Sequence, residues 1–517
     1  MNKKITALFL ILLFNLIFAQ FAGGTGSVED PYQIATADQL NNVRNYRTSS
    51  FIQTADIDLG VPPWNEGEGW EPIGDYDYSN PNLSFRGNYN GNDYHILNMY
   101  IQNPGTSFLG LFGSSDGCFF SNIKIIDFNL EGYSYLGGLT GISYKDTITN
   151  CNTIGNIKGA SNIGLLAGFF EGILLKNCHT VGGITSTFSM AGGLVADCSS
   201  IAINNCSSSI TISSEGNYIG GLIAFCVETD IIDSCYSICK ISSTGSKIGG
   251  LIGTLYDSKL VKNCFSRGSI NATSPTSEKI GGFLCQVSGF DSTSVELVNC
   301  YSTVDLTGTD YVGGFSGKTY ELASFENCYS TGQVTGNSNV GGFIGSIDSL
   351  NTVTVTNSYW DTETSGIDSS VAGEGRTTAE MTMPYGSNTY LDWDFSSVWR
   401  DDVINQNNGY PTFQWVSGIE ENDDDFIAGE KGFELFQNYP NPFNPVTQIK
   451  FDLAKNAQVK LSVYNISGQK VAELVNGTKQ AGLHTVDFDG SKLNSGVYYY
   501  TLVADGNSFT KKMVLTK

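Results

Sequence analysis

A repeat with two columns constrains the fold more than any other feature of this sequence. A phrase of the form [VIL]-G-[GL]-[LF], with Ala in place of the first residue at Gly192, recurs nine times at steps of 27 to 32 residues. A second column, usually Asn-Cys, keeps the same period over about 250 residues, which indicates an internal structural repeat. The first glycines of the phrase are Gly110, Gly137, Gly164, Gly192, Gly220, Gly249, Gly281, Gly313 and Gly341. The cysteines of the second column are Cys151, Cys178, Cys206, Cys235, Cys264, Cys300 and Cys328.

The length and composition of one repeat favour strands over helices. Each unit of about 28 residues has short apolar stretches separated by Gly, Ser, Asn and Thr, without apolar residues at helical spacing. At ~3.3 Å per strand residue, such a unit suits one coil of three short strands and three turns. We therefore expect an all-β chain with a parallel, right-handed β-helix of about nine coils at residues 105–360. A β-propeller is the rival fold, but its blades need roughly 40 residues or more.

Charge and the N-terminus limit the partners and the compartment. The formal net charge of −23 repels phosphate backbones, so we expect no nucleic acid partner. Lys3 and Lys4 precede an apolar run at residues 7–18, and small residues that suit cleavage follow it. We predict that residues 1–20 form a secretory signal peptide, with an uncleaved anchor as the alternative. No other apolar run is long enough for a membrane span, so we expect none in the mature chain.

The repeat resembles the GLUG motif of bacterial surface and secreted proteins. The stretches "IGGLIG" at 248–253 and "NCYSTGQVTG" at 327–336 carry the resemblance most clearly. Residues 21–104 resemble the N-terminal cap of such a solenoid, and residues 361–416 resemble its C-terminal cap. The resemblance implies an extracellular solenoid, but it implies little about activity, because the motif is a repeat and not a site.

The twelve cysteines leave two interpretations open. The seven in the repeat column fit a buried ladder of small apolar side chains, and Cys198 and Cys226 share a second offset, six residues after their glycines. Stacked cysteines are close enough to bridge, although in-register parallel pairs rarely have the torsion of a disulfide. We expect mainly free thiols, with some coil-to-coil disulfides as the alternative. No Cys-x-x-Cys motif or histidine pair points to a metal site.

The composition changes after residue 416. An acidic stretch at 417–431 is typical of a linker, and residues 432–517 alternate apolar and polar residues between turns, which predicts a small Ig-like antiparallel β-sandwich. This segment resembles the type A sorting domain of the type IX secretion system of Bacteroidetes-type bacteria. The resemblance implies the type IX machinery as partner, export through a Gram-negative periplasm, and release or attachment at the cell surface. Its carrying residues are Asn438, Tyr439, Pro440, Asn441, Pro442, Phe443, Gly468, Gly496, Tyr498, Lys511 and Lys512.

No motif in the chain marks a catalytic centre. Neither HExxH nor GxSxG occurs, and the acidic residues of the coils fall at different offsets, so no carboxylate pair stands out. Asp75 and Asp77 could hold Ca²⁺, but the stretch lacks the Gly and distal Glu of an EF-hand loop, and a solvated loop is favoured. We predict no catalytic residues and no cofactor. A carbohydrate-active β-helix enzyme, either a polysaccharide lyase or a glycoside hydrolase, is the alternative.

One column suggests a ligand-binding surface. In the later repeats the residue after the cysteine is aromatic, and in a strand it points away from its neighbour. With the cysteines in the core, these rings would line an outer face at coil spacing and could stack on sugar rings or contact a partner. The alternative is a ladder that stiffens the coils or lies under a loop. The rings belong to Tyr236, Phe265, Tyr301, Tyr329 and Tyr359.

The features together predict a secreted or surface-attached solenoid without catalytic activity. We expect it to act in an adhesin-like way, by binding an extracellular carbohydrate or protein.

Overall fold

The chain forms two compact units, Met1–Glu421 and Asn422–Lys517. The boundary between them falls inside the predicted linker. The computed structural model describes residues 20–77, 79–289, 294–348, 352–402, 407–416, 434–435, 438, 443–453, 457–466, 469–479, 482–504 and 507–516. The predicted linker and residues 1–19 of the predicted signal peptide therefore lie outside the described residues. Within the described part, no helix has the length and apolarity needed to cross a membrane.

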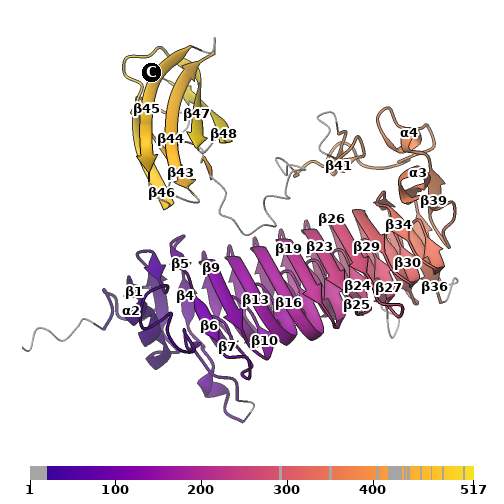
Figure 1. Ribbon diagram of the computed structural model, residues 1–517, viewed down its shortest axis with the longest axis horizontal. Helices are drawn as coiled ribbons and strands as arrows, with labels where there is room; N and C mark the ends of the chain where they lie inside the picture. The colour runs from indigo at the N-terminus through magenta and orange to yellow at the C-terminus, as the bar shows by residue number, and fades with distance from the viewer. Residues whose placement is uncertain are drawn as a thin grey trace, which may run out of the picture. The chain divides into compact units, whose positions relative to one another are not determined.

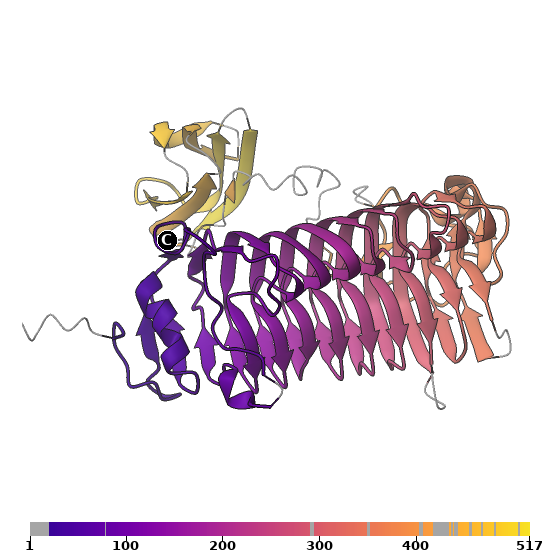
Figure 2. The same ribbon diagram turned by 60° about the horizontal axis from the view of Figure 1, so that its bottom comes forward.

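The first unit is a parallel β-solenoid, as the repeat predicts. Its coils follow one another along the axis as successive rungs (Figures 1 and 2). One side is a nine-stranded sheet with one strand per coil. Its strands are β7 (Phe112–Asp116), β11 (Thr140–Tyr144), β14 (Ala167–Glu171), β17 (Val195–Ser199), β21 (Ile223–Val227), β25 (Ile252–Tyr256), β28 (Leu284–Ser288), β31 (Ser316–Thr319) and β36 (Ile344–Ile347).

The other sides of the solenoid are built from rows of parallel strands that backbone hydrogen bonds join into one 30-stranded sheet. A row of short strands comes before the Asn-Cys column: β8 (Phe119–Ser121), β12 (Thr147–Thr149), β15 (Leu174–Lys176), β18 (Ala202–Asn204), β22 (Ile231–Asp233), β32 (Ala323–Glu326) and β37 (Val353–Thr356). A second row follows the column: β9 (Lys124–Glu131), β13 (Asn152–Gly164), β16 (His179–Gly192), β19 (Ser207–Ser214), β23 (Tyr236–Ser243), β33 (Tyr329–Ser330), β34 (Val334–Thr335) and β38 (Tyr359–Asp361). Strands β26 (Leu260–Ala272) and β29 (Val295–Thr307) run through both rows.

Short strands complete each coil and lead into the glycine column. They are β10 (Ser134–Leu136), β20 (Asn217–Gly220), β24 (Ile248–Gly249), β27 (Glu278–Gly281), β30 (Asp310–Gly313) and β35 (Ser338–Gly341). Parallel stacking starts before the repeats, because β1 (Tyr32–Ile34), β2 (Ser50–Gln53), β4 (Asn88–Asn90) and β8 pair in succession. Strands β3 (Ile57–Asp58), β5 (His95–Leu97) and β6 (Tyr100–Gln102) extend the stack in the same way, and α2 (Ala37–Asn42) lies in this N-terminal part.

The glycine column is a steric requirement of the coil corner. Gly164, Gly192, Gly220, Gly249, Gly281, Gly313 and Gly341 pair in register through successive coils, as predicted. A Cβ atom on Gly220 would lie 1.8 Å from the carbonyl oxygen of Ile223, and one on Gly249 would lie 1.8 Å from that of Ile252. Real Cβ atoms do not approach a backbone oxygen so closely, so any larger residue would force the corner open.

The Asn-Cys column forms a second corner. Its nine members from Asn122 to Asn357 have φ between 46° and 56°, and all are Asn except Ser234, because Asn tolerates the left-handed region better than most residues. Their side chains also join the coils: the Nδ2 atom of Asn177 donates to Oδ1 of Asn150 at 2.8 Å, and Asn205 donates to Asn177 at 2.9 Å. The corner therefore favours asparagine both for its backbone conformation and for a hydrogen-bonded ladder.

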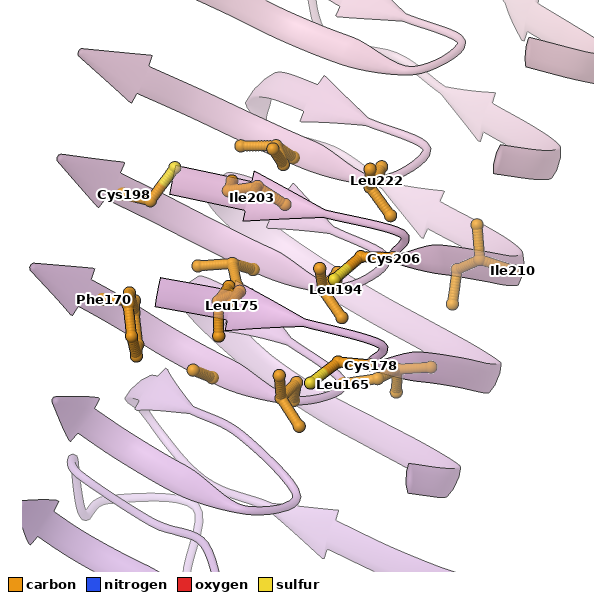
Figure 3. Packing of buried hydrophobic residues seen from close by; sticks show 14 of the residues in the cluster. Leu165, Phe170, Leu175, Cys178, Leu194, Cys198, Ile203, Cys206, Ile210 and Leu222 are labelled. Carbon is orange, nitrogen blue, oxygen red and sulfur yellow. The ribbon is translucent and has the colours of Figure 1, made fainter. Parts of the chain in front are cut away.

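The cysteines that follow these asparagines point into the core. All twelve cysteines are buried and none forms a disulfide in this structure, and the seven of the repeat column agree with the expected thiol ladder. Figure 3 shows Cys178 and Cys206 packed beside Leu165 and Leu194 inside successive coils. Burial raises the pKa of the Cys235 and Cys264 thiols, which keeps these groups protonated. They behave as small apolar core side chains.

The second unit is an antiparallel β-sandwich, as its alternating sequence predicts. One sheet contains β42 (Glu434–Leu435), β43 (Val446–Leu453) and β46 (Gly482–Asp489). The other contains β45 (Lys470–Lys479), β44 (Ala457–Asn465), β47 (Gly496–Ala504) and β48 (Asn507–Leu515). Ile449, Phe451, Leu461, Tyr500 and Met513 are fully buried between the sheets.

Candidate ligand-binding face

The predicted aromatic column exists, but its expected exposure is wrong. Phe265, Tyr301 and Tyr329 are 0% exposed and Tyr359 is 2% exposed, whereas Tyr236 is partly exposed. The first four rings stack at coil spacing, with centroids 4.9 Å apart between Tyr236 and Phe265, Phe265 and Tyr301, and Tyr301 and Tyr329. We call these five side chains the covered ladder. They point out of the coils, as the alternation predicts, yet solvent does not reach most of them.

The C-terminal cap of the solenoid lies over this ladder. The cap contains α3 (Thr362–Ser365), β39 (Glu374–Arg376), α4 (Thr378–Met381), β40 (Trp399–Arg400) and β41 (Thr412–Phe413). Trp399 lies 6.0 Å from the Tyr329 ring and donates from Nε1 to Oδ1 of Asn299 at 3.3 Å. The Tyr329 hydroxyl donates to the Pro411 carbonyl at 2.6 Å. The covered ladder therefore anchors the cap, and a sugar could not stack on its buried rings in this conformation.

A different row of aromatic residues is open to solvent, on the outer surface of the nine-stranded sheet. In the five-residue strands of this sheet the third and fifth positions face outward, and in the four-residue strands β31 and β36 the third position does, with Tyr320 directly after β31. Phe169 and Glu171 occupy them in β14, Phe225 and Val227 in β21. We call the outward side chains of this sheet, together with the residues just before the glycine column, the aromatic face. Its partly exposed rings are Phe108, Tyr135, Tyr144, Phe169, Tyr218, Phe225, Tyr256, Tyr311 and Tyr320.

The column before the glycines has unusual backbone geometry. In every coil the residue two positions before the first glycine has φ between 49° and 64°. Large residues rarely adopt this conformation, and residues held in it cluster at functional sites. The column is made of Phe108, Tyr135, Asn162, Met190, Tyr218, Lys247, Lys279, Tyr311 and Asn339. The fold thus holds bulky side chains on this surface in a backbone conformation that glycine or asparagine would adopt more easily.

The rings nearest the N-terminal end form one contiguous group. Phe108 stacks on Tyr135 with centroids 5.1 Å apart, and Tyr76 lies 4.7 Å from Phe108. Phe169 joins the group at 5.6 Å from Tyr144 and 6.5 Å from Tyr135. Five rings from four successive segments of the chain therefore make a partly exposed platform.

Two smaller groups continue the aromatic face along the solenoid. Phe225 lies 5.8 Å from Tyr218 and 5.7 Å from Tyr256, and Lys247 Nζ lies 4.0 Å from the centre of the Tyr218 ring. Further along, Lys318 Nζ lies 4.7 Å from the rings of both Tyr311 and Tyr320 and 3.0 Å from Asp348. The face thus alternates ring clusters with charged groups instead of forming one apolar patch.

Two carboxylates lie among the rings of the first two groups. Glu171 is exposed at the end of β14, and Asp197 lies at the third position of β17. Burial against its neighbours raises the pKa of Asp197 to about 6. This carboxyl group would therefore exchange its proton near neutral pH, in contact with whatever ligand occupied the face.

A cavity of about 480 Å³ lies at the N-terminal end of the face. Its size falls within the range of small-molecule sites. The lining combines ring faces with carboxylates and amides, and includes Glu68, Glu71, Asp75, Tyr76, Asn103 and Phe108. Because Tyr76 and Phe108 belong to both, the cavity and the first ring group form one continuous surface.

Among the described residues, Asp75 and Asp77 do not belong to a group of three or more His, Cys, Asp or Glu side chains that could bind Ca²⁺. The Asp77 carboxylate accepts hydrogen bonds from the Ser79 amide at 2.8 Å and the Ser79 hydroxyl at 2.7 Å, which lowers its pKa. Over the described residues, no three His, Cys, Asp or Glu side chains gather as metal ligands would. His179, the histidine of the repeat column, hydrogen-bonds through Nδ1 to the Ser207 hydroxyl at 2.8 Å.

Sequence reasoning missed the aromatic face, although the chain carries its signal. Tyr-x-Gly-Gly occurs at Tyr135, Tyr218 and Tyr311, two positions before the first glycine. Phe169 and Phe225 both stand five positions after that glycine. The rings of this face are spread over three offsets, whereas the covered ladder occupies one offset without interruption. A search for a single aromatic column therefore finds the covered ladder first.

The residues of the predicted sorting motif are partly described. The Asn438 amide donates to the Tyr500 hydroxyl at 2.8 Å, and Phe443 is buried with its amide bonded to the Val514 carbonyl. The Tyr498 hydroxyl donates to the Asn494 carbonyl at 2.8 Å, in the manner of the tyrosine corner of Ig-like domains. Gly496 begins β47, Lys511 and Lys512 are exposed on β48, and Tyr439, Pro440, Asn441, Pro442 and Gly468 lie outside the described residues.

Comparison with known proteins identifies the second unit. Residues 437–516 match the family described as secretion system C-terminal sorting domain. The C-terminal unit is therefore a sorting domain, which indicates interaction with the type IX secretion machinery and an extracellular or cell-surface location. This match covers the C-terminal unit and leaves the solenoid unassigned.

Two relatives resemble part of the chain. A Gly-rich membrane protein of Evansella cellulosilytica is 41% identical over 130 residues, which are 24% of this chain and 14% of that protein. Halomucin of Haloquadratum walsbyi is 30% identical over 141 residues, which are 26% of this chain and 2% of that protein. The chain thus spans only a small part of the length of either relative.

Proposed function

We propose that this protein is a non-catalytic, adhesin-like solenoid at the cell surface or outside the cell, and that its aromatic face binds extracellular polysaccharide. The observation that carries the proposal is the row of partly exposed rings over the nine-stranded sheet. The ring-bearing column before the glycines is held at positive φ along the whole row. Flat rings next to hydrogen-bonding groups suit sugars, which present both apolar C–H faces and hydroxyls.

A polysaccharide fits this surface better than a protein partner does. Lys247, Lys318, Glu171 and Asp197 interrupt the rings, so the face lacks the large continuous apolar centre of a stable protein interface. The ring groups also follow one another along the solenoid axis, at coil steps of ~4.8 Å. A linear ligand could contact several ring groups at once, so that several weak contacts would together give a higher affinity.

We also propose that the solenoid belongs to the GLUG-motif repeat proteins. The motifs quoted above and the parallel coils that they form support this assignment. A cleaved signal peptide at residues 1–20, passage through the periplasm and a source among Bacteroidetes-type bacteria are supported by the sorting domain. The surface character suggested by the names of the two relatives is consistent with this location.

The binding test uses the exported full chain and a panel of purified polysaccharides, in affinity electrophoresis and calorimetry. A double Tyr135→Ala, Phe169→Ala variant should lose roughly 10- to 100-fold affinity for the retained polysaccharide, since each ring contributes on the order of 1 kcal/mol. Phe119→Ala is the matched control, because Phe119 is an aromatic residue 45% exposed on another row of strands. Equal affinity of the double variant and the control would place binding elsewhere.

The same incubations test the enzyme alternative. Asp197 and Glu171 lie among the rings, and Glu68, Glu71 and Asp75 line the adjoining cavity, so a carbohydrate-active enzyme would be expected to use acids of this set. New reducing ends would indicate a hydrolase, and new unsaturated ends would indicate a lyase. Either product from the wild-type chain, absent with Asp197→Asn, would replace the binding proposal by a catalytic one.

A separate test addresses export. Deleting residues 430–517 should leave the solenoid folded and retained in the periplasm, because the sorting domain is a compact unit of its own. Cell fractionation with an antibody against the solenoid measures this. Unchanged delivery to the cell surface would contradict the type IX route.

A further inference from the structure

Two buried cysteines outside the repeat column, Cys198 and Cys226, meet through their sulfur atoms. Each thiol of the repeat column donates to the carbonyl oxygen two residues earlier in its own coil, at 3.0 to 3.4 Å. The thiols of that column also interact with the cysteines of adjacent coils. The Sγ atoms of Cys198 and Cys226 face each other across adjacent coils at 3.0 Å, and Cys226 Sγ also lies 2.8 Å from the Thr229 hydroxyl oxygen. Both residues are 0% exposed. The pair is therefore a sulfur–sulfur contact enclosed in the core.

The backbone around this pair suits a covalent bond. Cys198 in β17 and Cys226 in β21 are direct partners in the parallel ladder. Neighbouring strands lie ~4.8 Å apart, within the Cα separation of about 4.4–6.8 Å seen in disulfides. Phe170 precedes the pair in the ladder and Leu255 follows it, so no third cysteine stands at this register next to either sulfur. In-register parallel pairs rarely have the torsion of a disulfide, so both side chains must rotate from their 3.0 Å contact to close the bond.

We propose that Cys198 and Cys226 form a coil-to-coil disulfide in the exported protein, while the cysteines of the repeat column stay reduced. The proposal rests on export from the cytoplasm, which the sorting domain indicates, and not on ligand binding. Disulfides form and persist in compartments outside the cytoplasm.

The oxidant is a disulfide, carried by a thiol oxidase or a small molecule. The thiolate of Cys198 attacks one sulfur of this oxidant, which forms a mixed disulfide and releases one thiol. The thiolate of Cys226 then attacks the Cys198 sulfur and releases the second thiol. Two protein thiols are oxidised and one disulfide is reduced to two thiols, so electrons and protons balance.

The step belongs to folding rather than to the finished coil. The neighbouring Cys226 sulfur and burial raise the pKa of the Cys198 thiol, and thiolates are the reactive species. Oxidation is therefore fast only before the two coils close. Once formed, the bond would lock β17 and β21 in register directly beneath Asp197 and Phe225 of the aromatic face.

Peptide mapping of the exported full chain tests the proposal. The protein is denatured in N-ethylmaleimide, digested without reductant and analysed by mass spectrometry. We expect a linked peptide pair that contains Cys198 and Cys226 and that separates on reduction, with Cys206 and Cys235 alkylated. Alkylated Cys198 and Cys226, or linkage of either residue to another cysteine, would overturn the proposal, whatever the binding and export assays show.

Thermal unfolding with and without reductant provides a second measurement. Reductant should lower the Tm of the wild type by a few degrees, because the bond closes a loop of about 28 residues. Cys239→Ser is the control, since Cys239 is buried at 1% exposure and its ladder partners are Ile210 and Gly268. This control should respond to reductant as the wild type does, whereas Cys226→Ser should not respond. The absence of a reductant effect on the wild type and the control would count against the disulfide, even if Cys226→Ser failed to fold.

Discussion

The covered ladder and the aromatic face are two rows of rings on one solenoid with opposite surroundings. In both rows the coil repeat places aromatic side chains at matching positions of successive strands. The covered ladder packs against Trp399, Phe413 and other residues of the C-terminal cap, whereas the aromatic face is partly exposed. The coil period therefore predicts that the aromatic side chains form a row. Whether the row is buried depends on a separate segment of the chain, here the C-terminal cap.

The largest expected effect is the loss of stability when a ring that covers the ladder is removed, compared with a ring of the aromatic face. Trp399→Ala should lower the free energy of unfolding of the cap by about 3–5 kcal/mol, because a fully buried indole leaves a large cavity among the rings. Tyr218→Ala on the aromatic face should lower it by less than about 1 kcal/mol. Denaturant titration followed by tryptophan fluorescence measures both variants. Similar losses in the free energy of unfolding would mean that the two rows contribute equally to stability.

The second prediction concerns a carboxyl group that is buried behind the sheet, unlike Asp197. Asp146 is 0% exposed, and burial raises its pKa to about 6 although Ser115, Ser143 and the Cys118 amide donate to it at 2.6 Å. The pKa of Asp146 in the folded chain lies above the unfolded value of 3.8. The stabilising contribution of its protonated carboxyl group to the free energy of unfolding is therefore fully present below pH 4 and is lost as the pH rises to about 6.

The size of this effect follows from the pKa shift. The free energy of unfolding should fall by up to ~3 kcal/mol from this group between pH 4 and pH 6.5. Asp146→Asn should remove this part of the pH dependence, and Glu171→Gln, on an exposed side chain of the nine-stranded sheet, is the control. Denaturant midpoints at several pH values measure the slope. An unchanged slope in Asp146→Asn would show that other groups produce it.

The smallest expected effect is a pH dependence of polysaccharide affinity that arises from Asp197 on the aromatic face and not from Asp146 in the core. Because the pKa of Asp197 is raised to about 6, its carboxyl group changes from hydrogen-bond donor to acceptor only near that pH. Polysaccharide affinity should therefore change a few-fold between pH 5 and pH 7. Asp197→Asn should give a flat profile, and Asp146→Asn should keep the wild-type profile. The reverse pattern would mean that pH acts on binding through stability.

Much of the architecture follows from the sequence, because one period repeats its physical requirements in every coil. Gly220 and Gly249 stand where a Cβ atom would meet a backbone oxygen 1.8 Å away. Asn177 and Asn205 stand at a left-handed corner, and the cysteine after each asparagine points inward. The alternation of the C-terminal segment predicted its sandwich in the same way. Such local rules can be read from spacing alone.

The candidate site required the tertiary structure. Tyr329 stands next to a buried cysteine and points outward as predicted, but its burial depends on Pro411 and Trp399, which lie about 70 or more residues away in the chain. Tyr135 stays open because none of the described residues of the cap packs over its side of the solenoid. Exposure is set by contacts between segments distant in sequence, and the proximity of the Cys198 and Cys226 sulfur atoms is set by side-chain packing between coils. Spacing along the chain is enough to predict the coil, its corners and the inward or outward direction of side chains in its strands, whereas contacts between distant segments decide which rings meet solvent.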